Sequence, residues 1–386
     1  MEVADVLHAQ GQHFLDRHPW LSVQQRTVLR ALQRCRTAAL GGHVDRCGTC
    51  GHRALSYNSC RNRHCPKCQA QVRARWLTAR ERERLNLSYV HVVFTLPHTL
   101  HPLCRRNAAR LYDLLFRTSA TTLLEVAADP RHLGAAIGFL SILHTWGQTL
   151  VRHPHVHCVV PAGGFSRDHL RWVHPKCGGF FLPVKVLSRV FRGKFVEGLR
   201  RAYARGELNL GGATGPLHDP ARWHAFVDAL FRTDWVVYAK PAFGGPAAVL
   251  RYLGRYTHRV AISNHRLIAF DGERVTFRWK DYTHDGQWRT MTLTAMEFLR
   301  RFVQHVLPRG FVRIRQFGYL ANACRARHLT LARALLTRPP QPSSTSESPA
   351  TPGAVWACPR CGAPMVVGPI LTAQQLASAC LGFDTS

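Results

Sequence analysis

Two C-x-x-C pairs near the N-terminus have the spacing of a metal site. Fourteen residues separate the second cysteine of the first pair from the first cysteine of the second pair. Each short turn directs two thiolates to one point, and four thiolates complete a tetrahedral zinc site. Two residues beside the second pair, Cys60 and His64, could replace one of these ligands or belong to a second metal site, and the spacing does not decide between the two. We therefore predict one structural Zn²⁺, and its four ligands are Cys47, Cys50, Cys65 and Cys68.

A further C-x-x-C pair, Cys358 and Cys361, lies close to the C-terminus. Of the cysteines, Cys380 alone follows it, so the sequence shows no second pair after it. We interpret residues 356–386 as a tail that carries half of a zinc knuckle, and whether it binds zinc stays open.

A second kind of metal site is indicated at His155 and His157. The apolar residues Val156, Cys158 and Val160 predict a buried strand, and strand alternation places the two histidines together on its other face. Two imidazoles at this spacing can share a divalent ion that still has open positions for substrate oxygens. The pair alone is weak evidence, because the chain has 23 histidines.

Candidate nucleophiles follow about a hundred residues later. The sequence predicts a helix over 246–260, on which Tyr252 and Tyr256 share one face. A phenolate can attack the phosphorus of a DNA strand, and guanidinium groups can hold the neighbouring phosphates. The arginines that we expect to contact DNA are Arg251, Arg255 and Arg259 beside the tyrosines, and Arg61 and Arg63 in the cysteine cluster.

The composition supports a nucleic-acid partner. Lys and Arg total 52 against 22 Asp and Glu, so the formal net charge of the 386 residues is +30. A content of 46% hydrophobic residues predicts a globular protein. No run is apolar enough for a membrane span and the N-terminus does not resemble a signal peptide, so we expect a cytoplasmic, nucleoid-associated protein without membrane contact.

Several elements must position these residues, and together they predict an α+β fold. We expect helices over 3–40 with Ser22 as an N-cap, over 70–85, 105–127 and 133–151, strands near residues 89–97 and 235–241, and a hairpin through Asp271-Gly272. The predicted domains are a helical and zinc-binding module at 1–87, a nuclease domain at 88–330, a disordered linker at 338–355 and the tail.

In this order, the motifs resemble the HUH endonuclease superfamily and, more narrowly, the rolling-circle transposases of the IS91 (insertion sequence ninety-one) family. The resemblance spans roughly residues 10–325. The motifs that carry it are Leu40-Gly-Gly-His-Val-Asp-Arg-Cys47, Ser59-Cys-Arg-Asn-Arg-His-Cys-Pro-Lys-Cys-Gln69, His153-Pro-His-Val-His157 and Tyr252-Leu-Gly-Arg-Tyr256-Thr-His-Arg-Val-Ala-Ile-Ser-Asn264.

The resemblance implies an antiparallel sheet with flanking helices and a catalytic Mg²⁺ or Mn²⁺ bound by the histidine pair. It further implies that one or both tyrosines cut single-stranded DNA at the ends of an insertion sequence through a 5′-phosphotyrosine link. The third metal ligand varies within the superfamily. The candidates here are Gln148 first, then His144, His153 and His258.

Other functions remain open from the sequence. The same chemistry serves plasmid rolling-circle initiators and relaxases, and a zinc-dependent DNA-binding regulator would use the basic surface without cutting. No phosphate-binding G-x-x-x-x-G-K-[ST] loop is found, so we expect unwinding by a host helicase or replication machinery. The expected partners are single-stranded and double-stranded DNA at the element ends and at the target.

Overall fold

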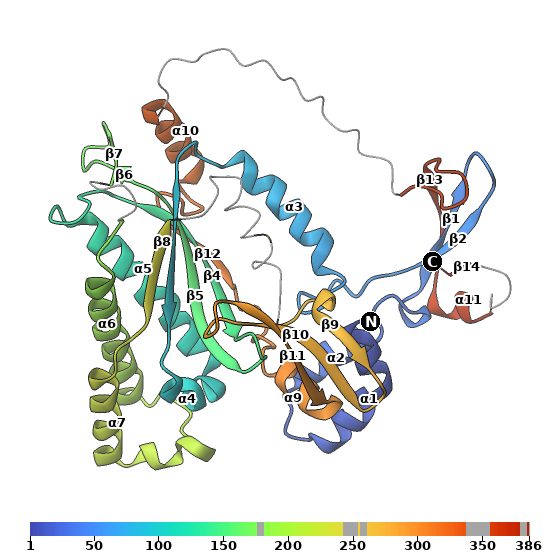
Figure 1. Cartoon of the computed structure of the whole chain (residues 1–386), viewed down its shortest axis with the longest axis horizontal. Helices are drawn as coiled ribbons and strands as arrows, with labels where there is room; N and C mark the ends of the chain where they lie inside the picture. The colour runs from blue at the N-terminus through green and yellow to red at the C-terminus, as the bar shows by residue number, and fades with distance from the viewer. Residues whose placement is uncertain (176–180, 242–253, 255–260, 337–355, 379–383, 386) are drawn as a thin grey trace.

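The computed structural model describes residues 1–175, 181–241, 254, 261–336, 356–378 and 384–385. Its centre is a five-stranded antiparallel sheet with the strand order β12-β4-β5-β3-β8 (Figure 1). Mixed helices and antiparallel strands confirm the predicted α+β class. The strands are β3 (Tyr89–Thr95), β4 (Gly138–Trp146), β5 (Arg152–Pro161), β8 (Val237–Pro241) and β12 (Ile314–Gly318).

One face of this sheet packs against long helices and forms the largest core. Val156, Cys158 and Val160 of β5 point into it, as the alternation predicts, and each is fully buried. The helices on this side are α4 (His101–Arg106), α5 (Ala108–Ala128), α6 (Val184–Ala204) and α7 (Pro220–Arg232), with the 3₁₀ turns η2 (His98–Leu100) and η3 (Gly212–His218). Because side chains alternate along a strand, the residues between these core residues point to the opposite face of the sheet.

A different helix covers part of that opposite face. Trp76 and Leu77 of α3 (Gln69–Arg82) pack on Leu140, Ile142 and Val159 of the sheet. The sequence predicted a charged helix over 70–85 and left open whether its charged face is solvated or contacts DNA. Most of its side chains are indeed polar, and a short apolar contact attaches it to the sheet.

One predicted element is wrong. Residues 133–151 were expected to be helical, but the segment contains β4, which pairs with β5 on one side and β12 on the other. A central strand that is buried on both faces has a continuous apolar sequence, so its pattern does not alternate.

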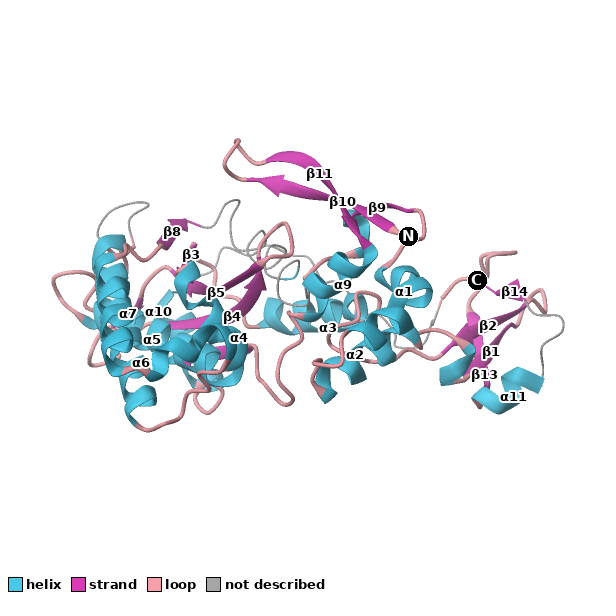
Figure 2. Ribbon diagram, turned by 90° about the horizontal axis from the view of Figure 1, so that it is seen from below, coloured by secondary structure: helices cyan, strands magenta, loops and turns pink. Residues whose placement is uncertain are grey.

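The N-terminal helices share a second core with a segment from late in the chain. This core joins α1 (Val3–Arg17) and α2 (Val23–Gln33) to α9 (Ala295–Val303) and to the sheet β11-β10-β9. Ser22 caps α2 as predicted, accepting from the amide of Gln25. The hairpin through Asp271-Gly272 is also confirmed, and it joins β9 (Leu267–Phe270) to β10 (Arg274–Asp281). The third strand, β11 (Gln287–Thr294), pairs with the other edge of β10. Figure 2 shows β10 and β11 projecting from the helices.

The first cysteine pair and the C-terminal tail meet in a third unit. Its sheet has the order β13-β1-β2-β14, which places the C-terminal tail beside the N-terminal cysteine segment (Figure 1). The predicted linker over 338–355 lies outside the described residues. The remaining elements are β1 (Gly42–Cys47), β2 (Arg53–Tyr57), β6 (Gly164–Phe165), β7 (Trp172–Val173), β13 (Met365–Leu371), β14 (Asp384–Thr385), α10 (Arg325–Leu336), α11 (Ala373–Ser378), η1 (Ala38–Leu40) and η4 (Asn264–Arg266). Within the described residues, no helix combines the length and apolar character needed to cross a membrane.

Candidate metal centres and DNA-cleavage site

Three histidines meet on the sheet face that α3 partly covers. His155 and His157 lie on β5, and His144 of β4 is directly opposite His155 in the antiparallel register. One ring nitrogen from each lies within 4.8 Å of the others, so the three imidazoles can reach one ion. The face predicted for the histidine pair is therefore confirmed, and His144 adds a third donor from the neighbouring strand.

Burial keeps the imidazoles of His155 and His157 neutral. Loss of solvation lowers the pKa of His155 to about 3. It also lowers the pKa of His157 well below its usual range, and the neighbouring imidazoles of His144 and His155 add to the shift. A neutral imidazole offers the lone pair that a metal ion needs. The donor set therefore fits a divalent cation.

Hydrogen bonds orient two of these rings. His155 Nδ1 donates to the carbonyl oxygen of His153 at 2.6 Å, which leaves its Nε2 lone pair available. His157 Nδ1 lies 2.7 Å from Nε2 of His91 on β3, and the two rings stack with centroids 4.9 Å apart. His91 was not predicted from the sequence. Its signal is the position in Tyr89-Val-His-Val-Val, where strand alternation places it opposite the apolar face.

The predicted third ligand, Gln148, occupies a different position. It follows the end of β4 in a turn, and its backbone carbonyl accepts a hydrogen bond from Arg266. Its role as a metal ligand stays a prediction. His144, the second candidate, is the residue that the structure brings into the cluster. His258 lies outside the described residues.

Both predicted nucleophiles, Tyr252 and Tyr256, lie outside the described residues, as do Arg251, Arg255 and Arg259. The residue midway between the tyrosines, Gly254, is described as buried and helical. A Cβ atom at Gly254 would lie 2.5 Å from Cδ1 of Leu77, so this glycine is in close contact with α3. Leu77 in turn packs on the sheet face that carries the three histidines.

The cysteines form two clusters instead of the single predicted site. Cys65 and Cys68 meet Cys35 and Cys60, with sulfur separations of 3.5 Å for Cys35–Cys68 and 3.6 Å for Cys60–Cys68. This corrects the predicted site, because the first C-x-x-C pair lies elsewhere. Cys60, an alternative ligand in the prediction, belongs to this cluster, and Cys35 was missed because it lies 25 residues before Cys60 without a paired neighbour.

The first pair, Cys47 and Cys50, joins the pair from the C-terminal tail. The sulfur of Cys47 lies 3.5 Å from that of Cys361, and the sulfur of Cys50 lies 3.7 Å from that of Cys358. All four sulfurs lie within 4.8 Å of one another. The half knuckle of the tail is thus completed by residues 308 or more positions earlier in the chain.

The raised thiol pKa values in the first cluster, which contains Cys35, Cys60, Cys65 and Cys68, favour a bound cation. Burial raises the pKa of Cys35 to about 12, and the contact with the Cys60 thiol together with burial raises the pKa of Cys65. Four thiolates at this separation need positive charge among them, which a zinc ion supplies. The two cysteine clusters therefore fit zinc binding.

His64 and Arg63 serve as links between segments. The amide of Leu307 donates to His64 Nε2 at 3.1 Å and His64 Nδ1 donates to the side chain of Asn62 at 3.0 Å, so both ring nitrogens are engaged. Arg63 donates to the backbone carbonyls of Pro308 and Phe311. His64 is therefore no zinc ligand here, while DNA binding by the exposed Arg61 stays a prediction.

Comparisons with known proteins agree with these features. The family described as "Transposase zinc-binding domain" matches residues 6–96, which include the first cysteine cluster, and the family described as "Putative transposase" matches residues 138–327, which include the three histidines. "Putative transposase y4qJ" of Sinorhizobium fredii is 51% identical over 345 residues, covering 89% of this chain and 86% of that protein. "Transposase for insertion sequence element IS801" of Pseudomonas savastanoi pv. phaseolicola is 29% identical over 317 residues, covering 80% and 73%. No solved structure matches.

Proposed function

The chain belongs to the IS91 family of transposases, and we propose that it cuts and rejoins single-stranded DNA at insertion-sequence ends through a 5′-phosphotyrosine intermediate. Membership in the family makes it a DNA-cleaving and rejoining enzyme. The strand type, the tyrosine chemistry and the metal dependence are the parts that we propose.

One observation carries the proposal. Three imidazoles, from His144, His155 and His157, converge on one sheet face, and Gly254 of the tyrosine motif packs on the helix attached to that face. Residues 138–327, which match the family described as "Putative transposase", include both the histidines and the tyrosine motif. This arrangement supports a site in which a phosphodiester lies between the imidazole cluster and a tyrosine hydroxyl.

The three histidines would hold Mg²⁺ or Mn²⁺. When bound, such an ion polarises the scissile phosphodiester and offsets the charge that develops on its oxygens. His91 holds the ring of His157 and the carbonyl of His153 holds that of His155, so the protein fixes two of the three rings before DNA arrives.

The tyrosines would carry out the exchange of phosphodiester bonds. The oxygen of Tyr252 or Tyr256 forms a bond to phosphorus, the phenol proton leaves, and the bond from phosphorus to the 3′ oxygen breaks. The departing oxygen is protonated to a free 3′-OH, which a later reversal of these steps joins to a new 5′ end. The linkage conserves the phosphodiester energy, so strand transfer needs no ATP.

The test is to trap the covalent intermediate on denaturing gels. We expect wild-type protein with Mn²⁺ to form an adduct with single-stranded oligonucleotides that tile the element ends. Peptide mapping should locate the adduct on Tyr252 or Tyr256. The double variant Y252F/Y256F and the variant H155A should lower its yield by at least about 10²-fold, because the first removes the nucleophile and the second a metal ligand.

The matched control is Tyr238→Phe, which removes the hydroxyl of an exposed tyrosine on β8, outside the tyrosine motif. It should form the adduct as the wild type does. An adduct of undiminished yield in Y252F/Y256F would contradict the mechanism, and duplex binding without any adduct would favour a DNA-binding regulator.

A further inference from the structure

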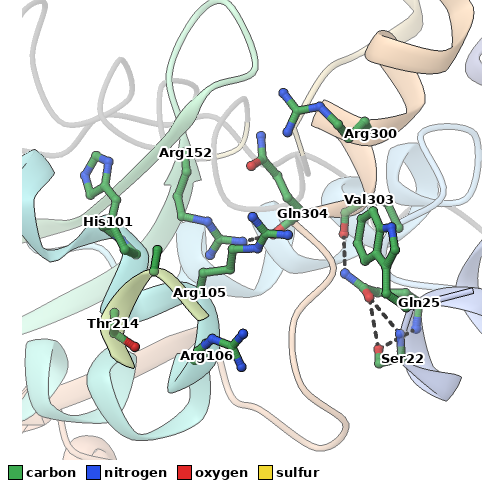
Figure 3. Close-up of a pocket in the computed structure, with 13 residues that line it drawn as sticks. Ser22, Gln25, His101, Arg105, Arg106, Arg152, Thr214, Arg300, Val303 and Gln304 are labelled. Atoms are coloured by element: carbon green, nitrogen blue, oxygen red, sulfur yellow. Dashed lines mark hydrogen bonds between the residues drawn. The ribbon is translucent and has the colours of Figure 1, made fainter. Parts of the chain in front are cut away.

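A cavity of about 740 Å³ lies between the N-terminal helices and the nuclease sheet (Figure 3). Three parts of the chain line it: Trp20, Ser22 and Gln25 around the start of α2; residues of α4 and η3; and residues from the start of β5 and the end of α9. Its volume falls within the range of about 300–1,000 Å³ that ligand pockets occupy. Neither the zinc clusters nor the proposed cleavage chemistry uses it.

The cavity is lined by four arginines, Arg105, Arg106, Arg152 and Arg300. Among the described residues that line it, none is Asp or Glu. Arg300 forms an ion pair with Glu297 just outside the cavity. The remaining three guanidinium groups face a space without a carboxylate, so the cavity favours an anion.

Two of these arginines, Arg105 and Arg106, have no acidic partner among the described residues. Within the described part of the chain, Arg105 and Arg106 make no ion pair, and both are exposed. The guanidinium of Arg106 lies against the backbone of Gly212, where a Cβ would come 2.4 Å from Nη2. Arg152 is fixed, donating to the hydroxyl of Tyr112 at 2.6 Å and to the carbonyl of Gln304 at 2.8 Å.

An aromatic surface lies beside these charges. Trp20 is 54% exposed, although its ring is large and apolar. The guanidinium carbon of Arg105 lies 5.7 Å from the ring centroid, a cation–π contact. An exposed indole next to unpaired arginines is the combination that single-stranded nucleic acid uses, with bases stacked on rings and phosphates on guanidinium groups.

The cavity also adjoins the imidazole cluster. His101, which lines it, has its ring 6.3 Å from that of His153, and His153 lies 4.9 Å from His155. The Nε2 atom of His101 is buried, and no described residue offers it a hydrogen-bond partner. Arg152 immediately precedes His153 on β5, so one strand connects the cavity to the cluster.

We propose that this cavity binds the single-stranded DNA flanking the scissile phosphate, with its phosphates on Arg105, Arg106 and Arg152 and one unpaired base on Trp20. The proposal rests on the proposed function for the position of the cut, whereas the binding itself can be measured without cleavage. It makes the N-terminal helices part of the DNA-binding surface, since they contribute Trp20.

The experiment measures binding of fluorescent thymidine oligomers by anisotropy over a range of salt concentrations, without added Mg²⁺ or Mn²⁺. We expect R105Q/R106Q to raise the dissociation constant about 10–30-fold at 0.1 M salt and to lower the slope of log affinity against log salt by about 1.4, since each phosphate contact on a single strand contributes about 0.7. Trp20→Ala should weaken binding about tenfold with an unchanged slope, because the indole is uncharged.

The matched control is R189Q/R200Q on α6. It also removes two exposed arginines, one of which lies over an aromatic ring, Phe231, as Arg105 lies over Trp20. Its salt slope should stay within a few tenths of the wild-type value. With an oligomer of abasic sites, Trp20→Ala should no longer lower the binding affinity, whereas R105Q/R106Q should still lower it.

Two results would overturn the proposal: a salt slope in R105Q/R106Q equal to that of the wild type, or a loss of duplex affinity as large as the loss for single strands. Failure of the proposed function looks different. In that case the wild type forms no tyrosine adduct, yet the binding slope still changes in R105Q/R106Q.

Discussion

His305 is buried, and its ring joins β4 and the turn after β4 to the segment that follows α9. Its Nε2 donates to the carbonyl of Leu150 at 3.0 Å and its Nδ1 accepts from the hydroxyl of Thr145 at 3.1 Å. Burial lowers the pKa of this imidazole to about 3. The unfolded chain has an ordinary histidine with a pKa near 6.5, so acid protonates the unfolded state first.

This residue predicts a pH dependence of stability. The contribution of neutral His305 is fully present above about pH 6.5 and is lost as the pH falls, at up to about 1.4 kcal/mol per pH unit. His305→Gln keeps a donor for Leu150 but loses the acceptor for Thr145, so we expect a loss of about 1–2 kcal/mol at pH 7. Urea unfolding from pH 7 to pH 4.5 should show the gap between wild type and variant narrowing toward acid. A constant gap would contradict the buried neutral histidine.

At the residue scale, the sequence located part of the candidate site. A repeat of two residues was enough to assign His155 and His157 to one face of a strand, because alternation is a local property. His144 and His91 reach the same place because β4 and β3 pair with β5, and the register between strands cannot be obtained from one segment. The same holds for Cys35, whose partners come from a loop that the sequence pattern does not relate to it.

At the element scale, α3 and the glycine of the tyrosine motif form a close contact. Gly254 has no side chain, and a Cβ there would lie 2.5–2.9 Å from three side-chain carbons of Leu77. In a helix, alanine is otherwise favoured over glycine by about 0.5–1 kcal/mol. Steric contact and helix propensity therefore act in opposite directions at this position.

We predict that Gly254→Ala destabilises the protein by about 1–3 kcal/mol, because Leu77 must move out of its contact with the sheet. In a Leu77→Ala background, the same change should be neutral or stabilising, since the clash is gone. Chemical unfolding of the two single variants and the double variant gives the coupling energy. A coupling near zero would show that Gly254 does not pack on α3 in solution.

β5 was predicted from the sequence and β4 was not, and the difference lies in how local the pattern of each strand is. β5 and the hairpin of β9 and β10 have turn residues and β-branched residues in local patterns, and both were located. β4 is buried along nearly its whole length, so its apolar run fits a buried helix as well as a buried strand. Tertiary pairing with β5 and β12 decides between them.

At the scale of the whole molecule, the segment of β1 and β2 forms one unit with the C-terminal tail. β13 of the tail pairs with β1, and Cys358 and Cys361 complete a cluster with Cys47 and Cys50. Sequence spacing could not show this, because the two pairs are separated by most of the chain. The contact implies that a metal ion and a few strand hydrogen bonds hold the tail in place.

We therefore predict two zinc ions per chain. The variant C358S/C361S should retain one zinc, as should Cys60→Ser, and their combination should retain none, as measured by metal analysis of the purified protein. Loss of zinc from one cluster should have a different effect from loss of zinc from the other. Cys60→Ser should lower the melting temperature of the N-terminal module, whereas C358S/C361S should release the tail.

Release can be measured by inserting a specific protease site between residues 340 and 350. After cleavage, we expect the tail fragment to stay with the body of the wild-type protein through gel filtration and to separate when a strong chelator is added, since zinc supplies most of the free energy that holds so small a unit. In C358S/C361S the fragment should separate without chelator, while in Cys60→Ser it should remain bound. If the wild-type fragment separates with zinc present, the cluster does not bridge the two ends of the chain.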